Sequence, residues 1–343
     1  MKIINNRFRG QIDALAGMDG IPWPSDDADR PAALLQRCPS ANATPLLDVP
    51  HLAVAAGVGK VSVKDERGRM GLGSFKALGA AYVIARDAEE GRAKGKTYVT
   101  ASAGNHGLSV AAGAAAFGAV SVIYLSETVP QDFATRLEDI GATVVRAGDN
   151  YEASQAAAVA AAADNGWTLL SDTSWHGYTE SPRILMEGYL VLMQEAVSQL
   201  ASPPTHIILQ AGVGGLAVAC GTYARKVWGA EPKIIVVEPE YAPAIFASIE
   251  AGSAQETSGP VSDMGRLDCK EPSLIALQGL GRDADRFMTI TEDEGFAGQD
   301  LCEAAGIPAS TSGAAGVAGL IAGKADLGLS TDSHVLCILS EGV

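Results

Sequence analysis

A lysine follows a glycine-rich turn in Gly71-Leu72-Gly73-Ser74-Phe75-Lys76-Ala77-Leu78-Gly79. The alanine-rich run after it predicts a helix over 75–87, so the lysine stands where a turn enters a helix. A single lysine in such a place is most often a solvated surface residue. A lysine amine can also anchor a carbonyl compound covalently and carry protons, so neighbouring motifs decide between the two interpretations.

Two further glycine-containing segments follow in the order that a cofactor site needs. Ser102–Gly107 comes after a predicted strand, and its Asn105 and His106 could also be capping residues. Gly212–Leu216 opens a predicted helix, where backbone N–H groups and the helix dipole attract a phosphate. One lysine, one Asn loop and one phosphate-binding glycine loop together predict a site for pyridoxal 5′-phosphate.

The glycine loop alone leaves other interpretations open. Gly212–Ala217 also satisfies the G-x-G-x-x-A pattern, and the acidic Glu238 follows about 20 residues after it at the end of a predicted strand. These are the marks of a dinucleotide-binding turn, which would indicate a nicotinamide oxidoreductase. A tight turn between strand and helix without any ligand is a third interpretation.

Short β-rich runs alternate with alanine-rich runs along most of the chain. We predict strands over 61–63, 97–100, 120–125, 143–145, 168–170, 206–209, 233–237 and 335–339. We predict helices over 75–87, 108–117, 130–140, 153–165, 182–200 and from 216 onward. The segment up to about residue 45 is predicted to be irregular, and 252–265 to be a long loop. The alternation predicts an α/β fold with a mostly parallel sheet covered on both faces.

The composition limits the class of function. The net charge is −15, with 25 Lys and Arg against 40 Asp and Glu, which argues against nucleic acid or an anionic membrane as a partner. The five cysteines and five histidines show no ligand or disulfide spacing, so no metal site is expected. Neither a secretory leader nor a long apolar run is apparent, so we expect a soluble cytoplasmic protein.

Several segments together resemble the fold-type-II pyridoxal-phosphate enzymes, which include threonine and serine dehydratases, cysteine synthases and tryptophan synthase β subunits. The similar segments are Lys64-Asp65-Glu66, 71–79, Gly104-Asn105-His106-Gly107, Asp172-Thr173-Ser174-Trp175-His176-Gly177-Tyr178, Gln210–Gly214 and Val237-Glu238-Pro239. The resemblance runs from about residue 40 to the end, and the Asp172 segment is similar to the 2,3-diaminopropionate ammonia-lyase branch. It implies two open, mostly parallel sheets flanked by helices. It also implies a large domain of residues 1–93 and 185–343, a small inserted domain of 94–184, and a homodimer.

The resemblance also implies roles for individual residues. Lys76 would carry the cofactor and act as catalytic base, and we expect burial to lower the pKa of its amine. Asp172 would be a second catalytic acid, although it could also cap a turn. The residues expected to bind the cofactor are Lys76, Asn105 at the 3-oxygen of its ring, Gly212, Val213, Gly214, Gly215 and Leu216 at its phosphate, and Ser340 at its pyridine nitrogen. The substrate carboxylate is expected at Ser102, Ala103, Gly104, Asn105 and His106.

The implied activity is α,β-elimination on a small L-amino acid. We expect 2,3-diaminopropionate to give pyruvate and ammonia, with an L-threonine, L-serine or 3-hydroxyaspartate dehydratase as the alternative. Ala103 stands where relatives have an acid or a serine, so we expect proton removal from one face only and use of the L enantiomer. Thr311, in Ser310-Thr311-Ser312-Gly313, replaces an acid of the ammonia-lyases. The chain ends three residues after Ser340, sooner than in relatives, so a further tail is expected.

Overall fold

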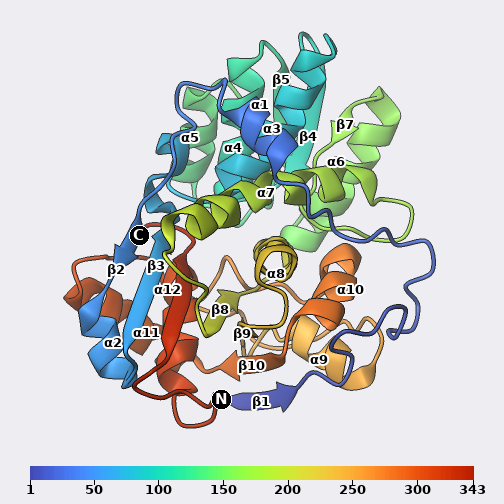
Figure 1. The fold of residues 1–343 in the computed structure, drawn as a ribbon. Helices are drawn as coiled ribbons and strands as arrows, with labels where there is room; N and C mark the ends of the chain where they lie inside the picture. Colours follow the sequence, from blue (N-terminus) through green and yellow to red (C-terminus); the bar gives the residue numbers. More distant parts are fainter.

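Two β-sheets organise the computed structural model, which describes residues 1–343 (Figure 1). The larger sheet has seven strands in the order β1-β10-β9-β8-β11-β3-β2, and the smaller has four in the order β6-β5-β4-β7. The strands of the larger sheet are β1 (Lys2–Asn5), β2 (Leu46–Asp48), β3 (Lys60–Asp65), β8 (His206–Gln210), β9 (Lys233–Pro239), β10 (Arg286–Ile290) and β11 (His334–Leu339). Those of the smaller sheet are β4 (Thr97–Ala101), β5 (Val120–Leu125), β6 (Thr143–Arg146) and β7 (Thr168–Leu169).

All strand pairs are parallel except those made by β1 and β2, the edge strands of the larger sheet. β1 pairs antiparallel with β10, and β2 pairs antiparallel with β3. The larger sheet is buried on both faces. Along β8, Ile207 and Leu209 belong to one apolar core and Ile208 to the other, because successive side chains of a strand point to opposite faces. Parallel strands place their carboxyl ends at one edge, and the loops that leave this edge are the usual place for a site.

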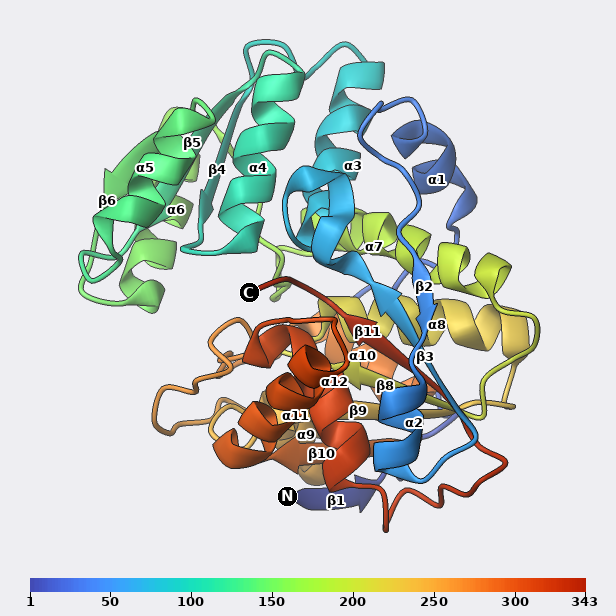
Figure 2. The same ribbon diagram turned by 90° about the vertical axis from the view of Figure 1, so that its left-hand side faces the viewer.

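Helices cover both sheets and separate them. They are α1 (Asp29–Leu35), α2 (Pro50–Ala56), α3 (Lys76–Glu89), α4 (Asn105–Ala116), α5 (Gln131–Asp139), α6 (Tyr151–Asn165), α7 (Glu180–Gln199), α8 (Gly215–Trp228), α9 (Ala244–Ala251), α10 (Leu274–Asp283), α11 (Glu292–Ala304) and α12 (Thr311–Ala322), with a short 3-10 turn at Glu66–Gly71. The long helix α7 packs against α3 and α8 and runs between the two sheets (Figure 1). The C-terminus also lies between the sheets (Figure 2).

The predicted α/β architecture is confirmed, and the predicted strands and helices coincide with observed ones within a few residues. The prediction that the first 45 residues are irregular is wrong in two places. Lys2–Asn5 pairs with β10 as an edge strand, and Asp29–Leu35 is a helix. The long loop is present between α9 and α10. All four strands of the smaller sheet come from 97–169, and the domain bounds at 94 and 184 stay a prediction.

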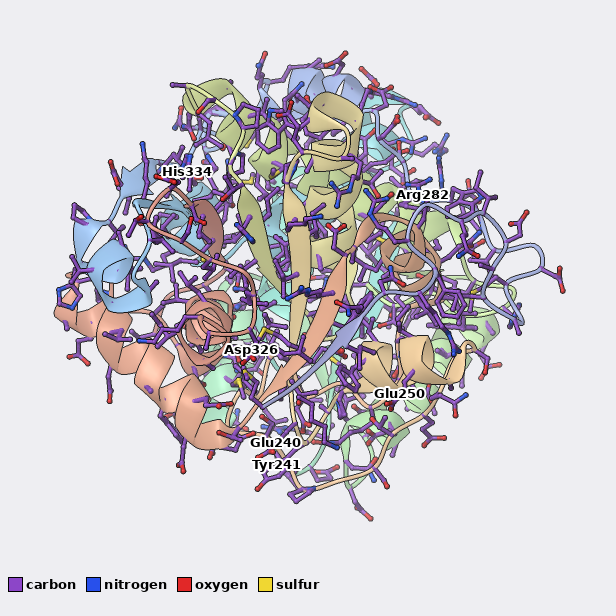
Figure 3. The ribbon with its side chains drawn as sticks, turned by 60° about the horizontal axis from the view of Figure 1, so that its bottom comes forward. Glu240, Tyr241, Glu250, Arg282, Asp326 and His334 are labelled. Atoms are coloured by element: carbon purple, nitrogen blue, oxygen red, sulfur yellow. The ribbon has the colours of Figure 1, made fainter.

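The loop between α9 and α10 is held in place near its C-terminal end. Lys270 donates to the carbonyl of Tyr241 at 2.7 Å and to Asp268 at 2.6 Å. Tyr241 follows β9, beside Glu240 (Figure 3). The loop is therefore held over the carboxyl end of β9.

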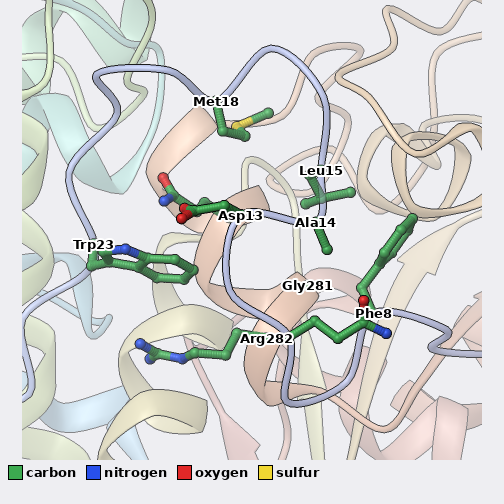
Figure 4. A pocket seen from close by; sticks show the side chains of 10 residues that line it. Phe8, Asp13, Ala14, Leu15, Met18, Trp23, Gly281 and Arg282 are labelled. Atoms are coloured by element: carbon green, nitrogen blue, oxygen red, sulfur yellow. The ribbon is translucent and has the colours of Figure 1, made fainter.

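Two hollows lie against helices of the fold. A cavity of about 10 Å³ lies beside Trp23, whose ring stacks under the guanidinium of Arg282 (Figure 4). It is too small for more than a single water molecule. A groove of about 600 Å³ runs between α1, α3 and α4, and its two charged lining residues, Arg37 and Glu89, pair with each other at 3.0 Å. No helix meets the length and hydropathy that a membrane-spanning segment requires.

Candidate functional site

Lys76 is the first residue of α3. The C-terminal residues of the chain hold the loop before it in place. The amide of Phe75 donates to the carbonyl of Ser340 at 3.1 Å, and the amide of Gly342 donates to the carbonyl of Gly73 at 3.1 Å. These two bonds pair the loop after β3 with the loop after β11. The lysine is thereby fixed at the carboxyl edge of the larger sheet.

A buried charge network supports this loop from behind. Arg69 is fully buried and donates to Glu66 at 2.7 and 2.8 Å and to Glu195 at 2.7 and 2.9 Å. Lys64, also fully buried, donates to Glu195 at 2.6 Å. Charges removed from water are tolerated when they are paired and hydrogen-bonded, as these are. The network joins β3 to α7 and leaves the turn before Lys76 little freedom to move.

The amine of Lys76 donates to Oδ2 of Asp172, which follows β7 of the smaller sheet. Burial by itself lowers the pKa of Lys76, but the carboxylate of Asp172 outweighs it and the pKa lies above its ordinary value. Burial likewise raises the pKa of Asp172, but the charge of Lys76 holds it below its ordinary range. The expectation of a lowered lysine pKa is therefore wrong for the free amine. The fold that buries Lys76 also places the carboxylate of Asp172 beside it, and this carboxylate raises the pKa by more than burial lowers it.

Two buried polar groups face this pair without a hydrogen-bond partner. Nε2 of His106 donates to the carbonyl of Leu170 at 2.7 Å, and its Nδ1 has no partner. Burial lowers the pKa of His106, so the ring is neutral at neutral pH. The ring of Tyr189 lies 5.8 Å from the lysine amine, and its hydroxyl has no partner either.

The predicted phosphate loop lies at the carboxyl end of β8. Gly214 has φ +99°, and a Cβ there would lie 2.8 Å from Ile245 and 2.9 Å from Ala276. A Cβ on Gly212 would lie 3.0 Å from the sulfur of Cys269. Gly215 begins α8, and no side chain caps the first turn of this helix. With Val213 and Leu216, the loop therefore offers a helix amino end whose N–H groups can take a phosphate.

Ser340 lies directly after β11 and is buried. Its hydroxyl oxygen accepts from Nε2 of Gln210 at 3.1 Å, which leaves the hydroxyl hydrogen free to be donated. Such a donor suits an unprotonated pyridine nitrogen, the role that the family resemblance implies for this position. Gln210 begins one of the similar segments, but no role was predicted for it, since a glutamine at the end of an apolar strand carries no signal of its own.

Asn105 begins α4, and its amide nitrogen donates to Oε2 of Glu341. Glu341 is buried, accepts from Oγ of Ser310 at 2.5 Å and lies 3.8 Å from Nε of Arg266. Burial raises the pKa of Glu341 above its ordinary value, against the opposing effects of Ser310, Arg266 and Lys76. Neither Glu341 nor Arg266 was predicted, because the loops that carry them meet only in the folded chain.

The predicted carboxylate loop joins β4 to α4. Oγ of Ser102 accepts from the amide of Gly104 at 3.3 Å, and Ala103 is exposed. A Cβ on Gly104 would lie 3.3 Å from Nε of Arg266, so this guanidinium lies over the loop. The structure thus brings all the predicted segments to the facing edges of the two sheets.

Glu238, the acidic residue of the dinucleotide-binding interpretation, accepts hydrogen bonds from a helix instead. It is fully buried, and its two carboxylate oxygens accept from the amides of Ile245 and Phe246 at 2.8 and 2.7 Å. Both amides belong to the first turn of α9, so the carboxylate caps this helix. It is therefore not available to a ribose.

The residues at the site fit a small polar cofactor with a phosphate. Five buried side-chain polar atoms in the protein lack a hydrogen-bond partner, and four of them belong to site residues: Ser74, His106, Tyr189 and Gln210. Buried polar atoms are otherwise almost always paired. The glycine loop, an amine, an Asn amide and a serine hydroxyl are the groups that pyridoxal phosphate needs.

Comparisons with known proteins agree with this fit. Residues 39–341 match the family model described as "Pyridoxal-phosphate dependent enzyme". A diaminopropionate ammonia-lyase from Salmonella typhimurium is 35% identical over 272 residues, covering 71% of this chain and 67% of that protein. The Escherichia coli enzyme of the same name is 32% identical over 334 residues, covering 87% and 84%.

Solved structures give the same result for the fold. The E. coli diaminopropionate ammonia-lyase in complex with an aminoacrylate–PLP azomethine reaction intermediate has a TM-score of 0.87 and 30% identity, covering 99% of this chain and 93% of that one. Threonine deaminase isoform 2 from Solanum lycopersicum has a TM-score of 0.82 at 21% identity, covering 100% and 95%. The latter shows a shared fold only.

Proposed function

Because the chain belongs to the family of pyridoxal-phosphate dependent enzymes, we propose that it removes the β-amino group of L-2,3-diaminopropionate. The enzyme is a pyridoxal-phosphate-dependent ammonia-lyase that acts on a small amino acid. One diaminopropionate and one water would give one pyruvate and two ammonia molecules. The observation that carries the choice of substrate is the carboxylate of Asp172 beside the amine of Lys76, where it can accept a β-ammonium group.

Pyridoxal phosphate, when bound, draws electrons from the α-carbon of the amino acid and so makes its hydrogen acidic. Lys76 would hold the cofactor covalently, and its amine would serve as the base that takes the α-proton. The amides at Gly212–Leu216 hold the phosphate. Ser340 would donate its hydroxyl hydrogen to the pyridine nitrogen, and Asn105 would donate to the 3-oxygen. A hydroxyl at the pyridine nitrogen, instead of a carboxylate, favours prompt loss of a β-substituent.

Asp172 would also control the protonation of Lys76. While the two are paired, the raised pKa of Lys76 keeps its amine protonated and unable to act as a base. A β-ammonium group that pairs with Asp172 takes this carboxylate away from Lys76, so the pKa of the lysine falls. Diaminopropionate would thus help to prepare the base that attacks it, and serine, which lacks a β-ammonium, would not.

The substrate carboxylate would bind at the loop 102–106, whose amides begin α4. Residues 94–184, which contain this loop, would form a small domain that closes on the substrate and excludes water. We expect a homodimer, which light scattering of the purified protein would test.

An L-serine, L-threonine or 3-hydroxyaspartate dehydratase is the second candidate. Thr311 supports it, because it is neutral where the ammonia-lyases have an acid and donates to the carbonyl of Asp263 at 2.9 Å. A panel of L-amino acids, with pyruvate or other keto acid and ammonia both quantified, separates the candidates. Two ammonia molecules per pyruvate from diaminopropionate, at the highest kcat/KM of the panel, support the first. One ammonia per keto acid, from serine or threonine at higher kcat/KM, supports the second.

The attachment of the cofactor has its own test. Borohydride reduction followed by peptide mapping should place the label on Lys76, and Lys76→Ala should lose both the label and the visible absorption band. Lys94→Ala is the control, because Lys94 is exposed and remote in sequence from the site. A label on another lysine, or none, would show that the proposed site is wrong.

A further inference from the structure

Glu341 is a buried carboxylate that the proposed mechanism does not use. It follows Ser340 just after the end of β11. The C-terminus of the chain lies between the two sheets (Figure 2). Glu341 is 6% exposed. Its two oxygens have different partners, since Oε1 accepts from Ser310 at 2.5 Å and Oε2 accepts from the amide nitrogen of Asn105.

These partners come from separate parts of the fold. Ser310 caps α12, on the larger sheet, through a bond from the amide of Gly313 at 3.0 Å. Asn105 begins α4, which follows β4 of the smaller sheet. Arg266, on the loop between α9 and α10, lies 3.8 Å from Oε2 and over Gly104. One carboxylate therefore connects three loops that meet at the site.

The carboxylate of Glu341 determines how the side-chain amide of Asn105 is oriented. An asparagine amide can turn about its last bond and present either its oxygen or its NH₂ group to a neighbour. An ionised carboxylate only accepts hydrogen bonds, so it selects the orientation in which the NH₂ group faces it. The NH₂ group has a second hydrogen, which stays free for another acceptor. The acceptor expected beside Asn105 is the 3-oxygen of the cofactor ring.

We propose that Glu341 is a positioning residue that fixes the amide of Asn105 with an N–H group directed at the cofactor ring. It also ties the beginning of α4 to the end of β11, and so limits how far the Asn105 loop can move away from the Lys76 loop. This inference rests on the proposed function only in the assignment of Asn105 to the cofactor. It does not depend on which amino acid is the substrate.

The test measures cofactor affinity and the visible absorption band of the purified protein. Glu341→Met keeps the length of the side chain and removes both acceptors, and we expect it to weaken pyridoxal phosphate binding about 10-fold and to shift the band. Glu341→Gln keeps an oxygen that can accept from Asn105, and we expect affinity within about 3-fold of the wild type. Both magnitudes correspond to the loss or retention of a single hydrogen bond. Glu250→Ala, which removes an exposed glutamate, should change neither readout.

A double-mutant cycle shows whether Glu341 acts through Asn105. If it does, Glu341→Met has no further effect on affinity or band in an Asn105→Ala background. Equal losses in both backgrounds, or no loss in either, would overturn the proposal. If Glu341→Met does not fold by circular dichroism, the same cycle with Glu341→Ala, which also removes both acceptors, at saturating cofactor and read from the band, decides it. There, an identical band shift with and without Asn105 overturns the proposal, and a shift only when Asn105 is present supports it. A missing borohydride label on Lys76 would instead disprove the proposed function, whatever the cycle gives.

Discussion

Lys76 and Asp172 form an ion pair that joins the start of α3 to the segment after β7 of the smaller sheet. The lysine and aspartate side chains are 21% and 17% exposed, so water screens the pair only in part. In the cofactor-free protein, the pair gives the site a protonated amine and an ionised carboxylate. Both pKa values depart from their ordinary ranges in the direction that favours the two charges.

The pair should contribute to the stability of the cofactor-free protein within a defined pH window. The pKa of Asp172 is lowered, so its contribution is present above its ordinary pKa of about 4 and is lost as the pH falls toward the folded value. The pKa of Lys76 is raised, so its contribution is present below about pH 10 and is lost as the pH rises further. At pH 7 we expect Asp172→Asn to lower the free energy of unfolding by about 2 kcal/mol. Urea denaturation should show this difference shrinking below pH 4, and a difference that does not change with pH would contradict it.

Removal of Asp172 should affect substrates unequally. Asp172→Ala takes away the acceptor for a β-ammonium group, so we expect kcat/KM for diaminopropionate to fall at least about 100-fold, the loss of one charged hydrogen-bonded contact. The fall for serine should be much smaller. In the wild type, the rising limb of the kcat profile should lie at higher pH for serine, because the released amine of Lys76 stays paired with Asp172. Equal losses on both substrates would contradict the amine-binding role.

Gly214 is expected to tolerate no side chain. Its φ of +99° is strained for alanine by about 1–2 kcal/mol, and the added Cβ would also meet Ile245 at 2.8 Å. Gly214→Ala should therefore lower stability and abolish the visible band of the bound cofactor. Gly118→Ala is the matched control, because Gly118 has φ +66° with nothing within 4 Å of a Cβ and lies outside the site. It should lose stability through backbone strain alone and keep the band.

Much of the fold could be predicted because the apolar runs that form strands can be recognised from the local sequence between turns. Eight of the eleven strands were found in this way, since a buried parallel strand is apolar throughout, whereas β1, β2 and the parallel strand β10 were not predicted. α12 was missed because three glycines interrupt it and glycine disfavours helices. Those glycines allow a close approach to the sheet, since a Cβ on Gly319 would lie 2.6 Å from Val237. β1 was missed because it exists only through pairing with β10, more than 280 residues later.

The residues of the candidate site also fall into two groups, those that local sequence motifs reveal and those that only tertiary packing brings to the site. Lys76, Asn105 and the glycine loop stand in recognisable local motifs. Glu341 and Tyr189 do not, since a glutamate near a chain end and a tyrosine in a helix gain their surroundings only from tertiary packing. The raised pKa of Lys76 was missed for this reason also, because it depends on a carboxylate 96 residues away.

Glu238 should make stability depend on pH in the opposite direction to Asp172. Burial raises the pKa of Glu238 to about 8, against the opposing hydrogen bonds from Ile245 and Phe246. The folded protein therefore holds a proton that the unfolded chain loses above its ordinary pKa of about 4.3, so stability falls as the pH rises from there to 8. In Glu238→Gln, the loss of one helix-capping acceptor should cost about 1 kcal/mol at every pH. The wild type should lose stability relative to this variant between pH 5 and 8, and parallel curves would show that Glu238 does not titrate in this range.

The enzyme should act on L-amino acids only. Removal of the α-proton from a D-amino acid needs a group on the face of the cofactor opposite Lys76, and Ala103 has no atom that can accept a proton. Ala103 is exposed at the beginning of the loop that would bind the carboxylate, so a longer side chain there would not disrupt the core. We expect no keto acid from D-serine or D-diaminopropionate and no racemisation of the L forms by chiral chromatography. Ala103→Asp supplies a carboxylate at this position and should give measurable keto acid from the D enantiomer, whereas Ala103→Asn, equal in size and without a base, should not. D-enantiomer turnover by the wild type would mean that another group, such as His106, serves the second face.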